Sequence, residues 1–224
     1  MRQFFFRRFS FRAFSLPALS LHAPSRASLA VLLLLAAAAP LLSGCIGVAV
    51  GGAAAGGVAA AEERGIKNAG NDKGIQLLID DQYVKHYQYL IRKVTVTVYE
   101  GRVLLTGVVG TEFSRDEATR LAWAASDRIN EVINELQVDA NDSLLDSASD
   151  TWISSQLRFK IATDEKIVDI NYNIDTVNGI VYLIGLAQSE DELTRVTDYA
   201  RTIKGVKKVI SHVWLKTDPR RKPV

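Results

Sequence analysis

The only cysteine of the 224-residue chain, Cys45, follows the stretch Leu42-Ser43-Gly44. A cysteine thiolate is a strong nucleophile, and the small residues before it leave the backbone open to a peptidase. An apolar run over residues 29–39 lies upstream, and the chain before that run carries arginine but no acidic residue. A basic segment followed by an apolar segment too short to span a bilayer is typical of a secretory signal peptide. The sequence therefore predicts a signal over residues 1–44 that ends at a reactive thiol.

The stretch from Leu42 to Cys45 resembles a bacterial lipobox, whose pattern is Leu, Ser or Ala, Gly or Ala, and Cys. The resemblance implies that the Cys45 sulfur takes a diacylglyceryl group and that the new N-terminus takes an N-acyl chain such as palmitate. We expect no other cofactor. Two alternatives remain open. One is an ordinary signal peptide with an incidental cysteine, and the other, on Arg7-Arg8-Phe9, is a twin-arginine signal or a start site placed too early.

Removal of the signal changes the charge of the chain. All five basic residues of the signal are arginines, so the mature chain keeps 22 of the 27 basic residues against all 25 acidic ones, a formal net charge of −3. Non-specific nucleic-acid binding depends on clustered positive charge, and we therefore expect no nucleic-acid partner. The 180 mature residues suffice for one medium or two small domains, and no disulfide can support them.

Residues 45–72 are predicted to be a lipidated Gly/Ala-rich tether. Its first part is weakly apolar and too short to cross a bilayer comfortably. Two glycine pairs in it could pack helices closely in lipid, namely Gly47 with Gly51 and Gly52 with Gly56. A Gly-rich coil of about 29 residues spans roughly 30 Å, so the folded part could reach back to its own membrane.

From Ile75 onward the chain repeats itself at an interval of about 78 residues, which predicts two copies of one domain. Each copy contains two strand-like runs that alternate apolar and polar residues, so each pair predicts a hairpin with one buried face. The runs are residues 94–99 and 102–107, then 170–175 and 180–185. The intervening turns are Glu100-Gly101 and Asn178-Gly179, and the second suits positive φ angles.

A helix follows each hairpin, and a last strand closes each copy. Ser114-Arg-Asp-Glu117 and Ser189-Glu-Asp-Glu192 both match the capping-box pattern of a helix N-terminus. The other expected elements are helices at about 75–90 and 150–162 and last strands at 132–138 and 209–215. This order predicts an α+β protein with two αββαβ repeats, each with a three-stranded mixed sheet packed on two helices.

This pattern resembles the BON domain over residues 73–216. The second copy carries the resemblance best, in Asn178-Gly179-Ile-Val-Tyr-Leu-Ile-Gly185 and in Gly205-Val206, where the first copy has Arg128-Ile129 instead. The implied parts are a first BON domain at 73–139, a linker at 140–149, a second BON domain at 150–216 and a basic tail at 217–224.

Two BON domains behind Cys45 resemble the dual-BON-domain outer-membrane lipoproteins, and Asp150-Thr-Trp-Ile-Ser-Ser also resembles that subgroup. The resemblance implies a lipid-anchored protein of the outer membrane that faces the periplasm, binds anionic phospholipid and supports envelope integrity. Ile46 agrees with this location, because an aspartate there is typical of retention at the inner membrane.

The candidate lipid-binding face lies on the helix that opens the second domain. Ile153, Leu157 and Ile161 form one stripe toward the sheet, and Trp152 and Phe159 lie roughly 140–160° away from it. The full candidate set is Trp152, Ser155, Gln156, Arg158, Phe159 and Lys160. Aromatic rings beside cations suit the headgroup level of an anionic membrane. The open alternative is that Trp152 packs between the two domains.

Catalytic and metal sites are not expected. The mature chain keeps His86 and His212, which lack metal-ligand spacing, and it contains no nucleophile or phosphate-loop motif. Acidic pairs such as Asp191-Glu192 fall at helix N-termini, where negative charge is favourable. We therefore expect a non-enzymatic protein. The rival functions are docking of the Trp152 face on an outer-membrane protein assembly machine and a periplasmic stress chaperone, while a hydrolase is disfavoured.

The end of the chain is basic, because Lys216 and Arg220-Arg221-Lys222 are accompanied by a single acid, Asp218. Such a tail predicts either attraction to acidic lipid or a solvated segment without a partner.

Overall fold

The structure, a computed structural model, describes residues 62–140 and 147–221. All of the described residues belong to one compact unit. Cys45 and the apolar part of the expected tether therefore lie outside the described residues. Within the described ranges, no helix is long and apolar enough to cross a membrane.

The first repeat follows the expected order of elements. They are α3 (Gly65–His86), α4 (Leu90–Lys93), β1 (Val94–Tyr99), β2 (Arg102–Val109), α5 (Glu112–Ala125), β3 (Glu131–Asn134) and β4 (Gln137–Val138). β1 pairs antiparallel with β2, whereas β3 and β4 both pair parallel with β2 in one register. The two short strands are thus one edge strand, interrupted where Asn134 Oδ1 accepts the Leu136 amide at 3.0 Å.

The second repeat has the same topology. Its elements are α6 (Ser147–Ala162), the 3-10 turn η2 (Asp169–Asn171), β5 (Tyr172–Val177), β6 (Ile180–Ala187), α7 (Glu190–Thr202) and β7 (Lys208–Leu215). β5 pairs antiparallel and β7 parallel with the central strand β6. The predicted fold class, two tandem αββαβ domains with mixed sheets, is confirmed.

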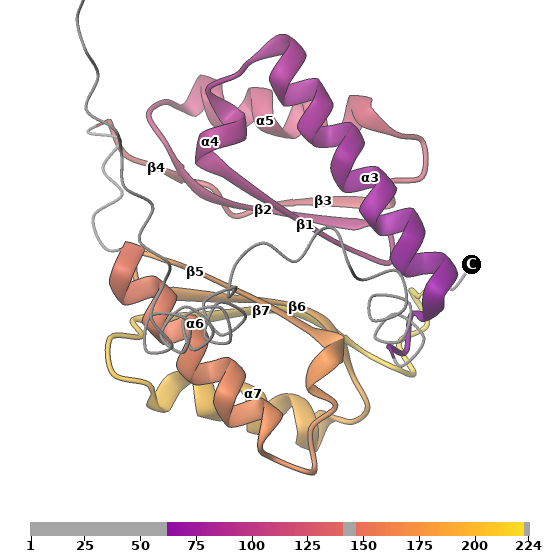
Figure 1. The fold of residues 1–224 in the computed structure, drawn as a ribbon, viewed down its shortest axis with the longest axis vertical. Helices are drawn as coiled ribbons and strands as arrows, with labels where there is room; N and C mark the ends of the chain where they lie inside the picture. Colours follow the sequence, from indigo (N-terminus) through magenta and orange to yellow (C-terminus); the bar gives the residue numbers. More distant parts are fainter. Residues whose placement is uncertain (1–61, 141–146, 222–224) are drawn as a thin grey trace, which may run out of the picture. The chain divides into compact units, whose positions relative to one another are not determined.

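One face of each sheet is covered by the two helices of its own repeat (Figure 1). In the first repeat, α3 buries Ile75, Ile79 and Tyr83 against the sheet. The residues 78 positions later are Ile153, Leu157 and Ile161, which are buried in the core of the second repeat. The stripe expected to face the sheet is therefore confirmed.

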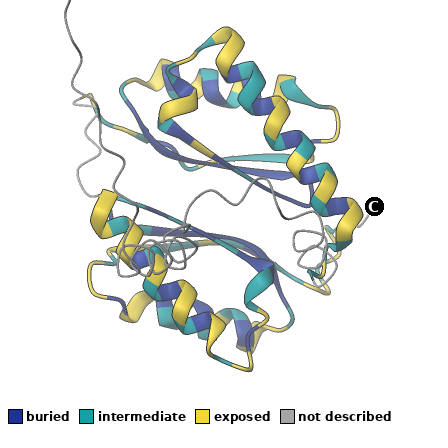
Figure 2. Ribbon diagram, viewed as in Figure 1, coloured by how far each residue is buried: buried dark blue, intermediate teal, exposed yellow. Residues whose placement is uncertain are grey.

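The opposite faces of the two sheets pack against each other. Tyr99 and Leu104 of the first sheet and Tyr182, Ile184 and Leu186 of the second form a third buried cluster. All of β2 and nearly all of β6 are buried as a result (Figure 2). The expectation of one buried face per hairpin is wrong for these central strands. Their near-continuous apolar runs are typical of strands buried on both faces.

Helix α3 is longer at its N-terminus than the sequence predicted. It begins at Gly65, inside the segment assigned to the tether, and it ends at His86. Apolar periodicity did not reveal the first turns because their core-facing positions are Asn68 and Asp72, which are polar yet buried. Buried polar groups are kept by hydrogen bonds, and those of Asp72 are described below. Residues 65–72 therefore belong to the folded repeat and not to a tether.

The two capping predictions fare differently. Helix α7 is capped as expected by Ser189, whose hydroxyl accepts the Glu192 amide at 3.2 Å. Helix α5 is capped by Thr111, three residues before the expected Ser114, and the Thr111 hydroxyl accepts the Ser114 amide at 3.1 Å. The prediction that Ser114 caps α5 is therefore wrong, because Thr111 offers the same kind of hydroxyl oxygen three residues earlier.

Glycine is required at one position in each central strand, β2 and β6, because the strand passes close to the segment that leads into its hairpin. Gly107 and Gly185 have φ angles of 128° and 151°. A Cβ at Gly107 would lie 2.1 Å from the Lys93 carbonyl oxygen, and one at Gly185 would lie 1.9 Å from that of Asn171. Neither position can accept a side chain without moving the backbone.

We expect Gly185→Ala to lower the free energy of unfolding by about 3 kcal/mol or more, since it combines a clash with an unfavourable φ. Gly70→Ala is the control. It lies in α3, no atom lies within 4 Å of its added Cβ, and we expect it to raise the stability by about 0.5–1 kcal/mol. Urea unfolding of residues 51–224 measures both. Equal effects would show that the close approach is not needed.

Candidate functional site

The first helix of each repeat is fastened to its hairpin turn by one aspartate. Asp72 accepts the amides of Glu100 and Gly101, both at 2.8 Å. Asp150 accepts the amide of Asn178 at 2.7 Å and that of Gly179 at 2.8 Å. The sequence analysis missed this role, although the two aspartates share the 78-residue interval of the turn glycines.

These carboxylates explain how the turns hold their shape. All four turn residues have positive φ, namely Glu100 (51°), Gly101 (73°), Asn178 (53°) and Gly179 (78°). A left-handed pair is the backbone of a two-residue hairpin turn, and it costs free energy at residues other than glycine. Two hydrogen bonds to a carboxylate offset that cost. The positive φ expected at Asn178-Gly179 is confirmed.

Asp150 lies in the first turn of α6, so this contact also fixes the helix that carries the candidate lipid-binding face. Farther along, the Ser154 and Thr176 hydroxyl oxygens lie 2.8 Å apart and link α6 to β5. Together with the buried stripe, these contacts set the rotation of α6. The outer face of α6 consequently has one defined orientation relative to the sheet.

The structure leaves both aromatic side chains of the candidate set in solvent. Trp152 is 49% exposed and Phe159 is 66% exposed. Trp152 is not a member of the cluster between the two sheets, so the alternative that it packs between the domains is not supported. Ser155 and Gln156 lie on the same outer side, exposed and half-buried respectively, and the Ser155 hydroxyl donates to the Thr151 carbonyl.

The two cations of the set flank this aromatic face on opposite sides. Arg158 reaches toward the sheet edge, where its Nη2 donates to the Ile174 carbonyl at 2.9 Å. Lys160 reaches toward α7, where its Nζ lies 5.4 Å from the centre of the Tyr199 ring. Each cation is therefore fixed by a contact within its own domain.

The matching helix of the first repeat carries a different surface. The residues 78 positions before Trp152 and Phe159 are Gly74 and Asp81, and Asp80 stands in place of Arg158. Burial raises the pKa of Asp80. The two repeats thus share a core but not this outer face, and of the two equivalent faces of α3 and α6 it is that of α6 that carries exposed aromatic rings and cations.

A buried arginine crosses the contact between the two sheets. Arg102 donates from Nε to Glu131 and from Nη1 to the His212 carbonyl, both at 2.8 Å. Its guanidinium lies 3.8 Å from the centre of the Trp214 ring. Burial lowers the pKa of Arg102, and these partners keep the buried charge tolerable.

Neither His86 nor His212, the two histidines that the structure describes, belongs to a metal-site arrangement. His212 Nε2 lies 2.9 Å from Glu135 Oε1, which joins the second repeat to the first, and His86 is exposed. Across residues 62–140 and 147–221, no group of three or more His, Cys, Asp or Glu side chains could hold a metal ion.

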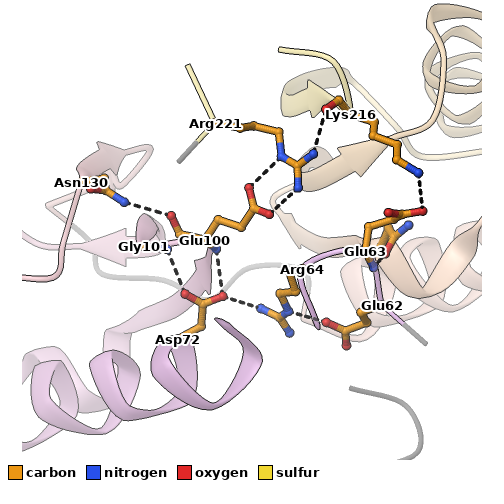
Figure 3. Close-up of polar contacts among 10 residues, drawn as sticks. Glu62, Glu63, Arg64, Asp72, Glu100, Gly101, Asn130, Lys216 and Arg221 are labelled. Carbon is orange, nitrogen blue, oxygen red and sulfur yellow. Dashed lines mark hydrogen bonds and ion pairs between the residues drawn. The ribbon is translucent and has the colours of Figure 1, made fainter. Parts of the chain in front are cut away.

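The basic tail is tied to the first repeat (Figure 3). Arg221 lies 2.6 Å from Glu100 Oε1 and 3.0 Å from its Oε2, and it donates to the Lys216 carbonyl at 2.8 Å. The hydrogen bonds with Glu100 raise the pKa of Arg221. Lys216 Nζ lies 3.0 Å from Glu63 Oε1. The prediction of a solvated tail without a partner is therefore wrong for the tail up to Arg221.

Arg220 is paired as well, because its guanidinium lies 2.6 Å from Asp218 and 4.7 Å from the centre of the Trp214 ring. The expected free cations are thus engaged within the protein, apart from Lys222, which lies outside the described residues. We place no lipid contact on this tail.

The geometry defines the class of protein, which is a tandem α+β repeat. Each αββαβ unit buries one face of its sheet under two helices. Residues 71–140 and 149–216 match the family model of the BON domain. Since these two matches cover more than half of the chain, the chain belongs to the BON-domain family.

Several curated proteins are similar over most of the chain. An Anaplasma centrale protein described as "Uncharacterized protein in gshII 5'region" is 40% identical over 68% of this chain and 99% of its own. The outer membrane lipoprotein DolP of Haemophilus influenzae is 31% identical over 80% of this chain and 92% of its own. Osmotically-inducible protein Y of Escherichia coli is 25% identical over 64% and 72%.

We expect Arg221→Ala to lower the free energy of unfolding by about 2–3 kcal/mol, because it leaves the buried Glu100 carboxylate without its cation. The control is Arg201→Ala, which breaks an exposed pair with Asp198 and should cost less than about 0.5 kcal/mol. Urea unfolding of residues 51–224 compares the two variants. If the two variants lose the same small amount of stability, the tail does not clamp the first repeat.

Proposed function

We propose that this chain is a non-enzymatic, lipid-anchored protein of the bacterial outer membrane that faces the periplasm and supports envelope integrity. In this proposal Cys45 carries the acyl chains, and the outer face of α6 binds anionic phospholipid. The similarity to an outer membrane lipoprotein supports the location. The lipobox-like stretch supports the anchor.

One observation carries the lipid-binding part of the proposal. Trp152 and Phe159 project from a rigidly held helix face and are flanked by Arg158 and Lys160. Tryptophan is favourable at the membrane interface, and each cation near an anionic surface contributes about 1 kcal/mol. The first repeat supports the inference by contrast, because its equivalent face has Gly74 and two aspartates.

The anchor and the helix face would have separate tasks. Two acyl chains already hold a protein stably on a membrane, so lipidated Cys45 does not need α6 for attachment. Contacts at α6 would instead select anionic regions of the membrane and orient the two repeats on it.

Vesicle co-sedimentation of residues 51–224 tests the proposal. This part lacks Cys45, so acyl chains cannot cause binding, and it contains all three buried clusters. We expect binding to phosphatidylglycerol-rich vesicles but not to zwitterionic ones. Trp152→Glu should weaken that binding at least about ten-fold, since it replaces the interfacial ring with a charge repelled by the surface.

The matched control is Trp123→Glu, because Trp123 is 47% exposed and lies on α5 of the first repeat. It should leave binding unchanged, and circular dichroism confirms that both variants fold. Equal loss in the two variants would contradict a specific role for α6. The absence of binding to either vesicle would overturn the proposal.

The second candidate is docking on a protein of the envelope assembly machinery. The exposed Trp152 favours it, because tryptophan and arginine dominate the energetics of protein interfaces. Salt separates the two functions, since binding to anionic lipid weakens as ionic strength rises, whereas an interface centred on aromatic rings changes less. Vesicle binding that stays constant between low and high salt would contradict recognition of anionic headgroups by Arg158 and Lys160, and absence of vesicle binding would leave protein docking as the better candidate.

A further inference from the structure

A cavity of about 520 Å³ opens beside α6, between the two repeats. Its walls come from α4 and the start of β1 in the first repeat and from α6 and β5 in the second. The volume falls within the range of about 300–1,000 Å³ typical of small-molecule sites. Ser155 and Arg158 of the candidate lipid-binding set line this cavity, so it adjoins the face proposed to bind lipid.

The two carboxylates in the cavity wall are already occupied by donors of the protein. Both Asp150 oxygens accept turn amides, as described above. One Asp175 oxygen accepts the Thr106 hydroxyl, and the other accepts the Thr176 amide at 3.0 Å. Burial also raises the pKa of Asp175. Both carboxylates are therefore engaged within the protein and offer little to a cation.

The remaining charges in the wall are positive. Arg92 and Lys93 come from α4 in the first repeat, and Arg158 comes from α6 in the second. The exposed Arg92 guanidinium makes no ion pair within residues 62–140 and 147–221. The exposed Thr95 hydroxyl adds a polar partner, whereas the Thr151 hydroxyl already donates to the Ser147 carbonyl at 2.7 Å. Arginine with hydroxyl donors is the usual protein environment for a phosphate group.

We propose that this cavity between the repeats binds a glycerophosphate group, with Arg92 and Arg158 as the cations on its phosphate. Its source is the headgroup of an anionic phospholipid that lies against Trp152 and Phe159, and this assignment rests on the proposed function. The first repeat then contributes directly to lipid recognition, although α3 has Gly74, Asp80 and Asp81 at the positions that match Trp152, Arg158 and Phe159.

The proposal is tested with residues 51–224 and two probes, soluble glycerol 3-phosphate and phosphatidylglycerol vesicles. Titration with glycerol 3-phosphate, followed by NMR, should shift the amides that line the cavity. Arg92→Gln should weaken both the soluble binding and the vesicle binding about five-fold. The control is Lys67→Gln, which removes an exposed α3 cation outside the cavity wall and should change either binding less than two-fold.

The two probes separate failure of this inference from failure of the proposed function. If the wild-type protein binds anionic vesicles but Arg92→Gln behaves like Lys67→Gln, the cavity does not take the headgroup, while lipid binding at α6 stands. If glycerol 3-phosphate binds in the cavity but vesicles do not bind, both the lipid source and the proposed function are overturned. Trp152→Glu should abolish vesicle binding and leave the glycerol 3-phosphate shifts intact.

Discussion

The rest of the structure depends on the burial of two sheet faces against each other. Each repeat covers one face of its sheet with its own helices, and the other face would present Tyr99 and Leu104, or Tyr182 and Ile184, to water. Apolar area of this kind is stabilising only when it is removed from solvent. The buried Arg102, stacked on Trp214 and bonded across the contact, is tolerated only because the two faces meet. The cavity beside α6 likewise exists only because the two repeats pack together.

Local sequence patterns predicted much of the fold. Period-two alternation located the hairpins, the Asn178-Gly179 dipeptide located a left-handed turn, and the 3.6-residue stripe of Ile153, Leu157 and Ile161 assigned the outer face of α6. From that stripe alone, the exposure of Trp152 and Phe159 followed. These inferences succeed because each concerns neighbours along one element, whose geometry is fixed by the backbone.

The contacts that sequence reasoning missed join residues far apart in the chain. Asp72 and Asp150 appeared to be ordinary polar residues of a tether and a helix start, because nothing nearby shows that a turn 28 or 29 residues away donates two amides to each. Their shared interval with the turn glycines was the available signal. The Arg221–Glu100 pair spans 121 residues, and no local pattern announces it. Basic residues in a tail look identical whether they are solvated or paired.

The position of that ion pair has a practical meaning for work on this protein. An affinity tag or fluorescent protein placed directly after Arg221 would begin beside a contact with the buried Glu100 carboxylate. The segment at Glu63 meets the same region through Lys216. Neither segment is therefore a neutral attachment point for a reporter. An exposed position such as Gly70, where an added side chain meets nothing, offers a labelling site that leaves the clamp undisturbed.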